Sequence, residues 1–339
     1  MRTIKWQPSE IDEAADWLKK GEVVAFPTET VYGLGADATN ESAVQKIYAA
    51  KGRPRDNPLI IHISSLSQMK EFVTEIPEKA ELVMSHFWPG PCTIVLKKKG
   101  PLAQSVTNGL DTVGIRMPDH PVALSLIEKA GVPLAAPSAN SSGKPSPTTA
   151  QHVINDLNGK ISGVIDGGPT GVGLESTVLD LTDPKRPTIL RPGGVSYEEL
   201  TEVLGRVYID GHLEDATQAP KSPGMKYRHY SPDKPVYILP VNGEQAAAII
   251  EGLKNEGHQI GLLVSDQSLK FLRSKDTVVF SLGDKSKPSE AASRLYDGLR
   301  VLDQSEVTVI LAEPYDSSGI GRAYMNRLEK AAEWLGQSL

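Results

Sequence analysis

The stretch that organises the chain covers residues 51–63 and reads Lys51-Gly52-Arg53-Pro54-Arg55-Asp56-Asn57-Pro58-Leu59-Ile60-Ile61-His62-Ile63. Its glycine and two prolines disfavour a helix, and each proline pushes the preceding residue into extended backbone. Because side chains alternate in an extended chain, we expect Lys51, Arg53 and Arg55 to share one side. Guanidinium forks and an ammonium suit an anion such as phosphate. A solvated basic loop is an equally good interpretation of these residues alone.

The totals for the whole chain predict two globular domains. Its 339 residues exceed the size of a typical single domain. A hydrophobic content of 39% with 23% charged residues suits a soluble protein with a sizeable core. The formal net charge of -6 argues against a general nucleic-acid coat protein, so binding of RNA or nucleotide would need a local basic patch.

The single cysteine, Cys92, limits the cell compartment and the metal chemistry that we expect. It rules out an intrachain disulfide and a zinc site built from cysteines. The first residues carry no apolar core of a signal peptide, and no apolar run is long enough to span a bilayer. We therefore expect a cytoplasmic protein without membrane contact.

The first part of the chain mixes helices and strands. A helix is expected after Ser9, ending at Gly21, and another after an Asn40 cap. Further helices are expected at 77–87 and 121–130 and from Ser196, which opens a capping box. The strands that we predict are 23–26, 59–63, 92–96, 112–117, 134–136, 163–166, 176–181 and 188–190.

The second part of the chain has a different rhythm. Residues 208–233 are rich in proline, glycine and charge, and we interpret them as an interdomain linker. After them, strands at 236–239, 260–264, 277–281 and 307–312 alternate with helices at 244–254, 288–303 and 320–335. This alternation predicts a small parallel-sheet α/β domain. The predicted domains are therefore residues 1–207 and 234–339.

The common catalytic signatures are missing from the sequence. It has no Gly-x-x-x-x-Gly-Lys-Ser/Thr loop, no complete dinucleotide fingerprint, no His-x-x-x-His pair and no Gly-x-Ser-x-Gly elbow. What remains is a set of polar loops at strand ends in the first domain, where α/β sheets bind ligands. These loops hold Thr30, Lys51, Arg53, Arg55, Asn57, Arg116, Ser138, Asn140, Ser176, Thr177 and Arg191. Such a set suits a reaction that depends on positioning and charge stabilisation.

Each of these residues also has an ordinary structural explanation. His62 can be a satisfied strand histidine, and Thr30 can cap a turn. Ser138 and Asn140 can be turn formers, while Arg191 can be solvated. Arg116, among apolar strand neighbours, needs an anionic partner from the protein or from a ligand.

Several short motifs in one order are more specific than any single residue. They are Pro27–Leu34, Lys51–Pro54, Asn57–Leu59, Arg116–Pro118, Pro137–Gly143, Glu175–Val178, Leu190–Gly193, Pro223–Tyr230, Gly319–Gly321 and Asn326–Arg327. With these motifs the chain resembles, over essentially its whole length, the threonylcarbamoyl-AMP synthase family in its long, two-domain form. The resemblance implies a YrdC-like twisted α/β N-terminal domain with a concave, positive cavity. It also implies a smaller Rossmann-like C-terminal domain.

The resemblance implies an enzyme of the nucleotidyltransferase type. The family makes threonylcarbamoyl-AMP and pyrophosphate from L-threonine, bicarbonate or CO2, and ATP, with Mg2+ accompanying the ATP. The product feeds the threonylcarbamoyl modification of an adenosine in tRNAs that read A-starting codons. A downstream transferase complex performs the transfer to tRNA and is therefore the expected partner. Weak direct contact with tRNA stays open.

The family's site can be carried over residue by residue onto the matching motifs. The catalytic cations would be Lys51 and Arg53. L-threonine would lie near Thr30, His62, Arg116, Ser138 and Ser176. ATP would contact Arg53, Arg55, Asn57, Thr112, Asn140, Thr148, Arg191 and, from the linker, Tyr230. The linker is expected to fold over the cavity and exclude water from the intermediate.

Two alternative functions remain open from the sequence. One is an RNA-binding or ribosome-associated module that uses the same basic cavity, which predicts salt-dependent RNA affinity without a need for threonine. The other is a carbamoyl-adenylate former that uses carbamoyl phosphate. Such domains usually sit in longer chains with zinc-finger-like cysteines, whereas Cys92 stands alone here.

Overall fold

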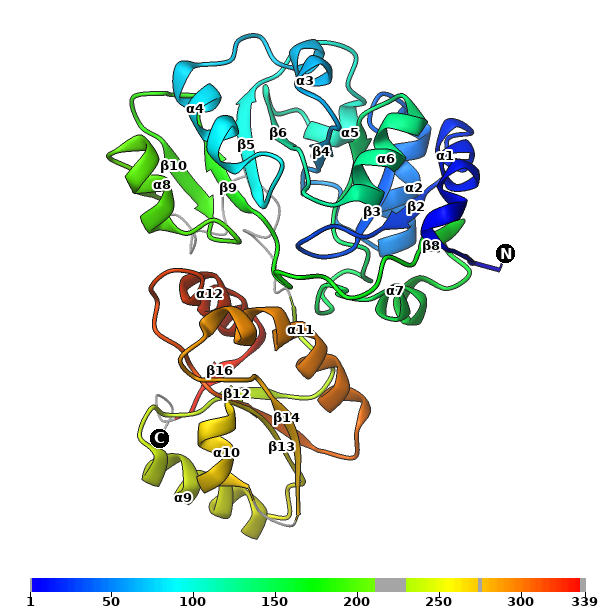
Figure 1. The fold of residues 1–339 in the computed structure, drawn as a ribbon. Helices are drawn as coiled ribbons and strands as arrows, with labels where there is room; N and C mark the ends of the chain where they lie inside the picture. Colours follow the sequence, from blue (N-terminus) through cyan, green and yellow to red (C-terminus); the bar gives the residue numbers. More distant parts are fainter. Residues whose placement is uncertain (1, 211–229, 274–275, 336–339) are drawn as a thin grey trace. The chain divides into compact units, whose positions relative to one another are not determined.

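The computed structural model describes residues 2–210, 230–273 and 276–335, which fall into two compact units (Figure 1). The first unit comprises Met1–Ser142, Ser146–Gly171 and Glu175–Tyr227. The second comprises Gly143–Pro145, Val172–Leu174 and Arg228–Leu339. Most of the predicted linker, residues 211–229, lies outside the described residues. The domain limits and the role of the linker as a cover therefore stay predictions.

The first unit is built on a mixed sheet, which has eleven strands in the described part of the chain. Their order across the sheet is β1 (Ile4–Trp6), β8 (Gly163–Ile165), β2 (Val24–Phe26), β3 (Gly33–Asp37), β7 (Leu134–Ala135), β4 (Ile60–His62), β6 (Thr112–Arg116), β5 (Cys92–Lys97), β9 (Thr177–Asp180), β10 (Thr188–Arg191) and β11 (Tyr208–Ile209). The pairs β4–β6 and β5–β9 are parallel, while β5–β6 is antiparallel. Strands distant in sequence thus lie side by side at the centre.

The helices of this unit begin where the sequence provides caps. The side chain of Asn40 accepts the Ala43 N–H, and Ser196 with Glu199 forms the predicted capping box. The helical segments are η1 (Pro8–Glu10), α1 (Ile11–Lys19), α2 (Glu41–Lys51), α3 (Leu66–Phe72), α4 (Glu78–Phe87), α5 (Gln104–Thr107), α6 (Pro121–Ala130), α7 (Ala150–Leu157) and α8 (Tyr197–Leu204). Among the described residues, none of the helices combines the length and the apolar character that crossing a bilayer requires.

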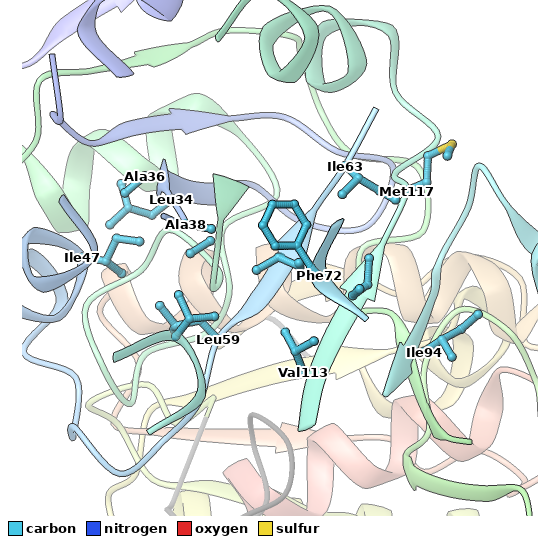
Figure 2. Close-up of a cluster of buried hydrophobic side chains, with 14 of the residues drawn as sticks. Leu34, Ala36, Ala38, Ile47, Leu59, Ile63, Phe72, Ile94, Val113 and Met117 are labelled. Carbon is cyan, nitrogen blue, oxygen red and sulfur yellow. The ribbon is translucent and has the colours of Figure 1, made fainter. Parts of the chain in front are cut away.

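Strand alternation separates two faces at the centre of the sheet. Ile61, Ile94 and Ile115 point into the main core, together with apolar side chains of α2 and β3. Figure 2 shows part of this core, with Leu34 of β3 near Ile47 of α2. The residues between these positions face the other way and form a small separate cluster of Ile60, Val95, Val178 and Leu190. The face of the sheet opposite the main core therefore has its own set of side chains.

One expectation about residues 51–63 is wrong. Lys51 is the last residue of α2, and Gly52 ends this helix in the left-handed region, with φ 63°. Buried Val44 and Ile47 extend the helix to Gly52, since both prolines come only afterwards. Lys51 and Arg53 therefore belong to a helix and to a loop, and they do not form one extended row with Arg55.

Strand β3 is not among the strands predicted from the sequence, because it contains two glycines, which are uncommon inside strands. The glycines are needed for close packing on β2. A Cβ at Gly35 would lie 2.8 Å from Cε1 of Phe26, and one at Gly33 would lie 3.1 Å from Cζ of the same ring. Tertiary packing thus outweighs the usual meaning of glycine in a short polar stretch.

The second unit confirms the predicted parallel sheet, with every strand pair parallel in its described residues. The strand order is β14 (Thr277–Ser281), β13 (Ile260–Val264), β15 (Val309–Ala312), β12 (Val236–Ile238) and β16 (Glu333–Trp334). The helices are α9 (Gly243–Asn255), α10 (Asp266–Leu272), α11 (Pro288–Gln304) and α12 (Gly321–Ala331). Helices α9 and α10 contact each other, as do α11 and α12, and Figure 1 shows the two pairs on opposite faces of the sheet. This is a doubly wound arrangement.

Candidate active site

The candidate site lies on the face of β4, β6, β5 and β9 that points away from the main core, which we call the site face. Alternation along β6 puts Thr112, Gly114 and Arg116 on this face. A Cβ at Gly114 would lie 3.2 Å from Cγ2 of Thr93 and 3.4 Å from Cγ1 of Ile60, so these side chains share the face. Polar side chains therefore lie at both ends of the site face, and apolar groups lie between them.

The carboxyl ends of β4 and β6 place a cation beside a neutral histidine. His62 is the register partner of Arg116, and both side chains are buried. Burial, together with the nearby Arg116 charge, lowers the pKa of His62 to about 3. The ring is therefore neutral at physiological pH, and its Nδ1 is buried without a hydrogen-bond partner.

Arg116 faces a carboxylate that the sequence analysis did not select. Its Nη2 lies 2.6 Å from Oε1 of Glu29, with 5% and 14% of the two side chains exposed. Arg116 Nη2 and both Glu29 oxygens are buried and make no hydrogen bond, so the contact between the two side chains is an ion pair only. The Nε of Arg116 donates to the Gly90 carbonyl at 3.2 Å, which fixes the guanidinium. The pair thus retains bonding capacity for a further group.

The segment that carries Glu29 is held by its own hydroxyl groups. The Thr28 Oγ1 accepts the N–H of Thr30 at 3.1 Å and that of Val31 at 3.2 Å. The hydroxyls of Thr28 and Thr30 lie 2.9 Å apart, and both side chains are buried. The residue that caps this turn is therefore Thr28 and not Thr30, and the turn fixes the backbone on both sides of Glu29.

Ser176 and Arg191 meet at the next part of the site face. The Ser176 Oγ lies 2.8 Å from the Thr93 Oγ1, and Arg191 Nη2 donates to the Ser176 carbonyl at 2.9 Å. Arg191 is buried, so the solvated interpretation is wrong for it. A Cβ at Gly193 would lie 2.3 Å from the Ser176 carbonyl carbon, so the chain after Arg191 approaches Ser176 as closely as only glycine allows. The position of Ser176 is thus fixed from two sides.

The amino end of β4 holds a second group of polar residues. Arg53 donates to the carbonyls of Asn57 and Pro58 at 3.2 and 3.0 Å. Asn57 is almost completely buried, and its Oδ1 has no hydrogen-bond partner. Extending the β4–β6 register places Thr112 opposite Pro58, at this same end. Thr112 and Arg116 are therefore about 13 Å apart along β6.

Lys51 binds the loop that follows β7. Its ammonium donates to the carbonyls of Ser138 and Asn140 at 2.5 and 2.6 Å, and lies 3.3 Å from Asn140 Oδ1. The hydroxyl of Ser138 donates to the same Asn140 oxygen at 2.6 Å. In this structure Lys51 therefore fixes the loop, and its predicted contact with phosphate stays a prediction.

Three further predicted ATP contacts, Thr148, Arg55 and Tyr230, have other surroundings in the structure. Thr148 is buried, and its N–H donates to Nδ1 of His152 at 3.3 Å. Arg55 is exposed. Tyr230 belongs to the second unit, where its ring stacks on Tyr296 with centroids 5.3 Å apart. Its φ of 67° is unusual for a residue other than glycine, so its surroundings hold it in place.

Two residues of the site face were not selected from the sequence. Glu29 lies inside the motif Pro27–Leu34, but a carboxylate is not expected to bind an anion such as phosphate. Thr93 could have been found from strand alternation, since Cys92 and Ile94 on either side of it face the core. Each of the two residues contacts a site residue that is distant in sequence: Glu29 contacts Arg116, and Thr93 contacts Ser176.

Comparison with known proteins agrees with this fold. One family model, covering Sua5, YciO and YrdC and described as telomere recombination, matches residues 16–193. A second, described as the C-terminal domain of threonylcarbamoyl-AMP synthase, matches residues 195–333. The chain belongs to the threonylcarbamoyl-AMP synthase family. The resemblance noted from the sequence is thereby confirmed.

Relatives of the same name extend over nearly the whole chain. The threonylcarbamoyl-AMP synthase of Bacillus subtilis is 50% identical over 324 residues, which are 95% of this chain and 93% of the relative. The one from Pyrococcus abyssi is 49% identical over 94% of this chain and 93% of its own length. The crystal structure of P. abyssi Sua5 complexed with L-threonine superposes with a TM-score of 0.91 at 45% identity, covering 98% of this chain and 99% of that one. The predicted α/β fold is thus confirmed for both family domains.

Proposed function

We propose that the protein is a threonylcarbamoyl-AMP synthase that makes threonylcarbamoyl-AMP and pyrophosphate from L-threonine, bicarbonate or CO2, and ATP. One observation carries the proposal beyond family membership. The site face has unsatisfied buried groups of both charges at one end, on Arg116 and Glu29, and a second polar group about 13 Å away. A small amino acid joined to a nucleotide phosphate is a ligand of this length and polarity.

The amino-acid end would be the one around Arg116. A guanidinium binds a carboxylate through two parallel hydrogen bonds, whereas Nη2 of Arg116 makes an ion-pair contact with Glu29 and no hydrogen bond. Thr30, His62, Ser138 and Ser176 are the other residues that we propose near L-threonine. The neutral His62 would offer a hydrogen bond without adding charge, since its pKa lies far below physiological pH.

ATP would extend toward the amino end of β4. We propose that Arg53, Asn57 and Thr112 contact the nucleotide there, with Asn140 on the loop after β7. Arg191, whose guanidinium donates to the Ser176 carbonyl, is a further proposed ATP contact. Arg55, Thr148 and Tyr230 are further proposed ATP contacts. For Lys51 we propose an indirect effect in addition to any phosphate contact, because it fixes the loop that carries Ser138 and Asn140.

The chemistry would proceed in two balanced steps. The ammonium group of threonine releases two protons to solvent as its nitrogen forms a bond to the carbon of CO2, which leaves a carbamate. A carbamate oxygen then bonds to the α-phosphorus of ATP, while the bond from that phosphorus to the β-phosphate oxygen breaks and pyrophosphate leaves. Both steps need alignment and positive charge more than a protein nucleophile. Arg53 would stabilise the charge on the phosphate oxygens.

Mg2+ and the cellular setting complete the proposal. Mg2+ commonly reaches nucleotide sites on phosphate oxygens, where it neutralises charge. Within residues 2–210, 230–273 and 276–335, no group of three His, Cys, Asp or Glu side chains could hold a metal ion. We propose that the reaction takes place in the cytoplasm. There its product would pass to the transferase complex that modifies tRNAs reading A-starting codons.

Pyrophosphate chemistry tests this function. We expect exchange of labelled pyrophosphate into ATP only when L-threonine and bicarbonate are both present. The variant Arg53→Ala should lower turnover at least tenfold, since each hydrogen bond to a charged group contributes roughly 1.5–3 kcal/mol. Arg186→Ala, which removes an exposed arginine of the same unit, is the control. Absence of exchange, together with RNA affinity that falls with salt and needs no threonine, would support the RNA-binding alternative instead.

A further inference from the structure

The Glu29–Arg116 pair is unusual because neither partner is fully used. Each side chain is largely excluded from water, and the two are 2.6 Å apart. A carboxylate can accept about four hydrogen bonds, yet neither oxygen of Glu29 has a hydrogen-bond partner. Buried charges in folded proteins are normally both paired and hydrogen-bonded. This carboxylate is therefore short of donors.

The residues around Glu29 do not supply those donors. The hydroxyl of Thr28 is used by the Val31 carbonyl and by Thr30, so it does not reach the carboxylate. His62, beside Arg116, is neutral because burial and the Arg116 charge lower its pKa to about 3. Arg116 already directs its Nε to the Gly90 carbonyl. The missing donors are thus more easily supplied by a ligand than by the protein.

We propose that Glu29 binds the α-ammonium group of the amino-acid substrate and holds Arg116 in place while the site is empty. The proposal rests on the function proposed above and assigns a residue to one end of its substrate. When the amino acid binds, its carboxylate replaces Glu29 as the ion-pair partner of Arg116. Glu29 then turns its oxygens to the ammonium group.

Charge balance supports this exchange. In the empty site, one negative and one positive side chain neutralise each other. A zwitterion adds one charge of each sign, so each buried charge again meets an opposite one. Neither entry nor exit leaves an isolated charge away from water, which would be costly. A ligand with a carboxylate but no amine would take Arg116 and leave Glu29 without a cation.

This arrangement predicts selection for the amine itself. A site built to bond a polar group of its substrate strongly rejects the analogue that lacks the group, because the protein side is left unpaired. The informative analogue is 2,3-dihydroxybutanoate, in which a hydroxyl replaces the amine of threonine. It retains the carboxylate for Arg116 and the side-chain hydroxyl of threonine.

Isothermal titration of the full chain with L-threonine and with this analogue tests the proposal. We expect the unmodified protein to prefer threonine by at least ~100-fold. The variant Glu29→Gln should bind L-threonine more weakly. Its preference for threonine over the analogue should fall below ~10-fold, because a neutral amide does not need a cationic partner. Glu22→Gln, which removes a carboxylate paired with Lys46 in the same unit, is the matched control and should keep the full preference.

Each remaining outcome has a defined meaning. If Glu29→Gln keeps the full preference, Glu29 does not bind the amine, while the proposed function stands. If the unmodified protein binds both ligands within ~10-fold, the inference fails whether or not the variant folds. Glu29→Asp, which keeps the charge on a shorter side chain, should retain an intermediate preference. If L-threonine does not bind at all, the proposed function fails and the inference with it.

Discussion

Two ion pairs, Glu29–Arg116 of the first unit and Glu313–Lys285 of the second, both lie at or beyond the ends of sheet strands but have different surroundings. In the second unit, Glu313 follows β15 and Oε1 lies 2.9 Å from Nζ of Lys285. Its Oε2 accepts the Ser265 N–H at 2.6 Å, and Oε1 accepts the hydroxyl of Ser268 at 2.7 Å. Lys285 also donates to the Pro314 carbonyl at 2.6 Å. Both carboxylate oxygens of Glu313 therefore accept hydrogen bonds from the protein, whereas neither oxygen of Glu29 does.

The difference shows how to separate a structural ion pair from one that is ready for a ligand. Glu313 joins the ends of β13 and β15, which is where a doubly wound sheet would bind a ligand. At this position the Glu313 carboxylate is already hydrogen-bonded to the protein. Glu29 leaves its oxygens unsatisfied at the end of the site face. Satisfaction of hydrogen bonds distinguishes the two pairs better than burial or charge does.

The largest expected effect follows from removing Glu313. The variant Glu313→Ala leaves Lys285 and the Ser265 N–H without their partner. We expect the free energy of opening of β13 and β15 to fall by about 3 kcal/mol, the low end for a broken buried pair, because Lys285 is 39% exposed. Hydrogen exchange of peptides from these strands in the full chain measures the loss.

The matched control for that change is Glu251→Ala. Glu251 pairs with Lys254 on the surface of α9, and 66% of its side chain is exposed. It should change opening by no more than about 0.5 kcal/mol. L-threonine affinity should be the same in both variants. Reduced threonine binding in Glu313→Ala would contradict the view that this pair only stabilises the second unit.

The two regions should lose stability in different pH ranges as the pH is lowered. His62 has a folded pKa of about 3, below its ordinary value of 6.5, so the unfolded chain binds the proton first as the pH falls. Stability from neutral His62 is therefore complete above pH 6.5 and is lost progressively down to about 3. Between pH 7 and pH 5 the loss should be about 2 kcal/mol.

Glu313 responds in a lower range. Burial opposes its ionisation, but hydrogen bonds from Ser265, Ser268 and Lys285 outweigh burial and hold its pKa below the usual 4.5. Its contribution is present above pH 4.5 and is lost as the pH falls through the folded pKa. Hydrogen exchange of β4 and β6 at pH 7 and pH 5 should show the loss, and His62→Gln should abolish it. The same change at the exposed His258 should leave it intact, and equal losses in all three proteins would refute the assignment.

Sequence reasoning succeeded where the information is local. The caps at Asn40 and Ser196 fixed the starts of two helices. The alternation that places Arg116 on one side of β6 could be read from its neighbours alone. Short motifs around Arg53 and Ser176 were recognisable because each loop is continuous in sequence.

It failed where a residue's role depends on distant parts of the chain. Lys51 was predicted to be an extended cation, but its ammonium binds carbonyls almost ninety residues later in the sequence. Glu29 and Arg116 come from segments far apart, as do Ser265 and Glu313. No periodicity encodes such pairs, because they arise only when strands meet in the sheet. For the same reason, the sequence did not predict β3, whose glycines pack against Phe26 of β2.

The smallest expected effect comes from exchanging the cations of the two pairs. Arg116→Lys keeps the positive charge and removes the planar fork that we propose for the substrate carboxylate. L-threonine affinity should fall about tenfold, or about 1.4 kcal/mol, while stability stays nearly constant. In the second unit, Lys285→Arg keeps the charge beside Glu313 and should leave threonine affinity unchanged. If Arg116→Lys binds threonine as the unmodified protein does, a point charge is sufficient there. The unsatisfied geometry of Arg116 would then have no bearing on recognition, and the distinction between the two pairs would rest on stability alone.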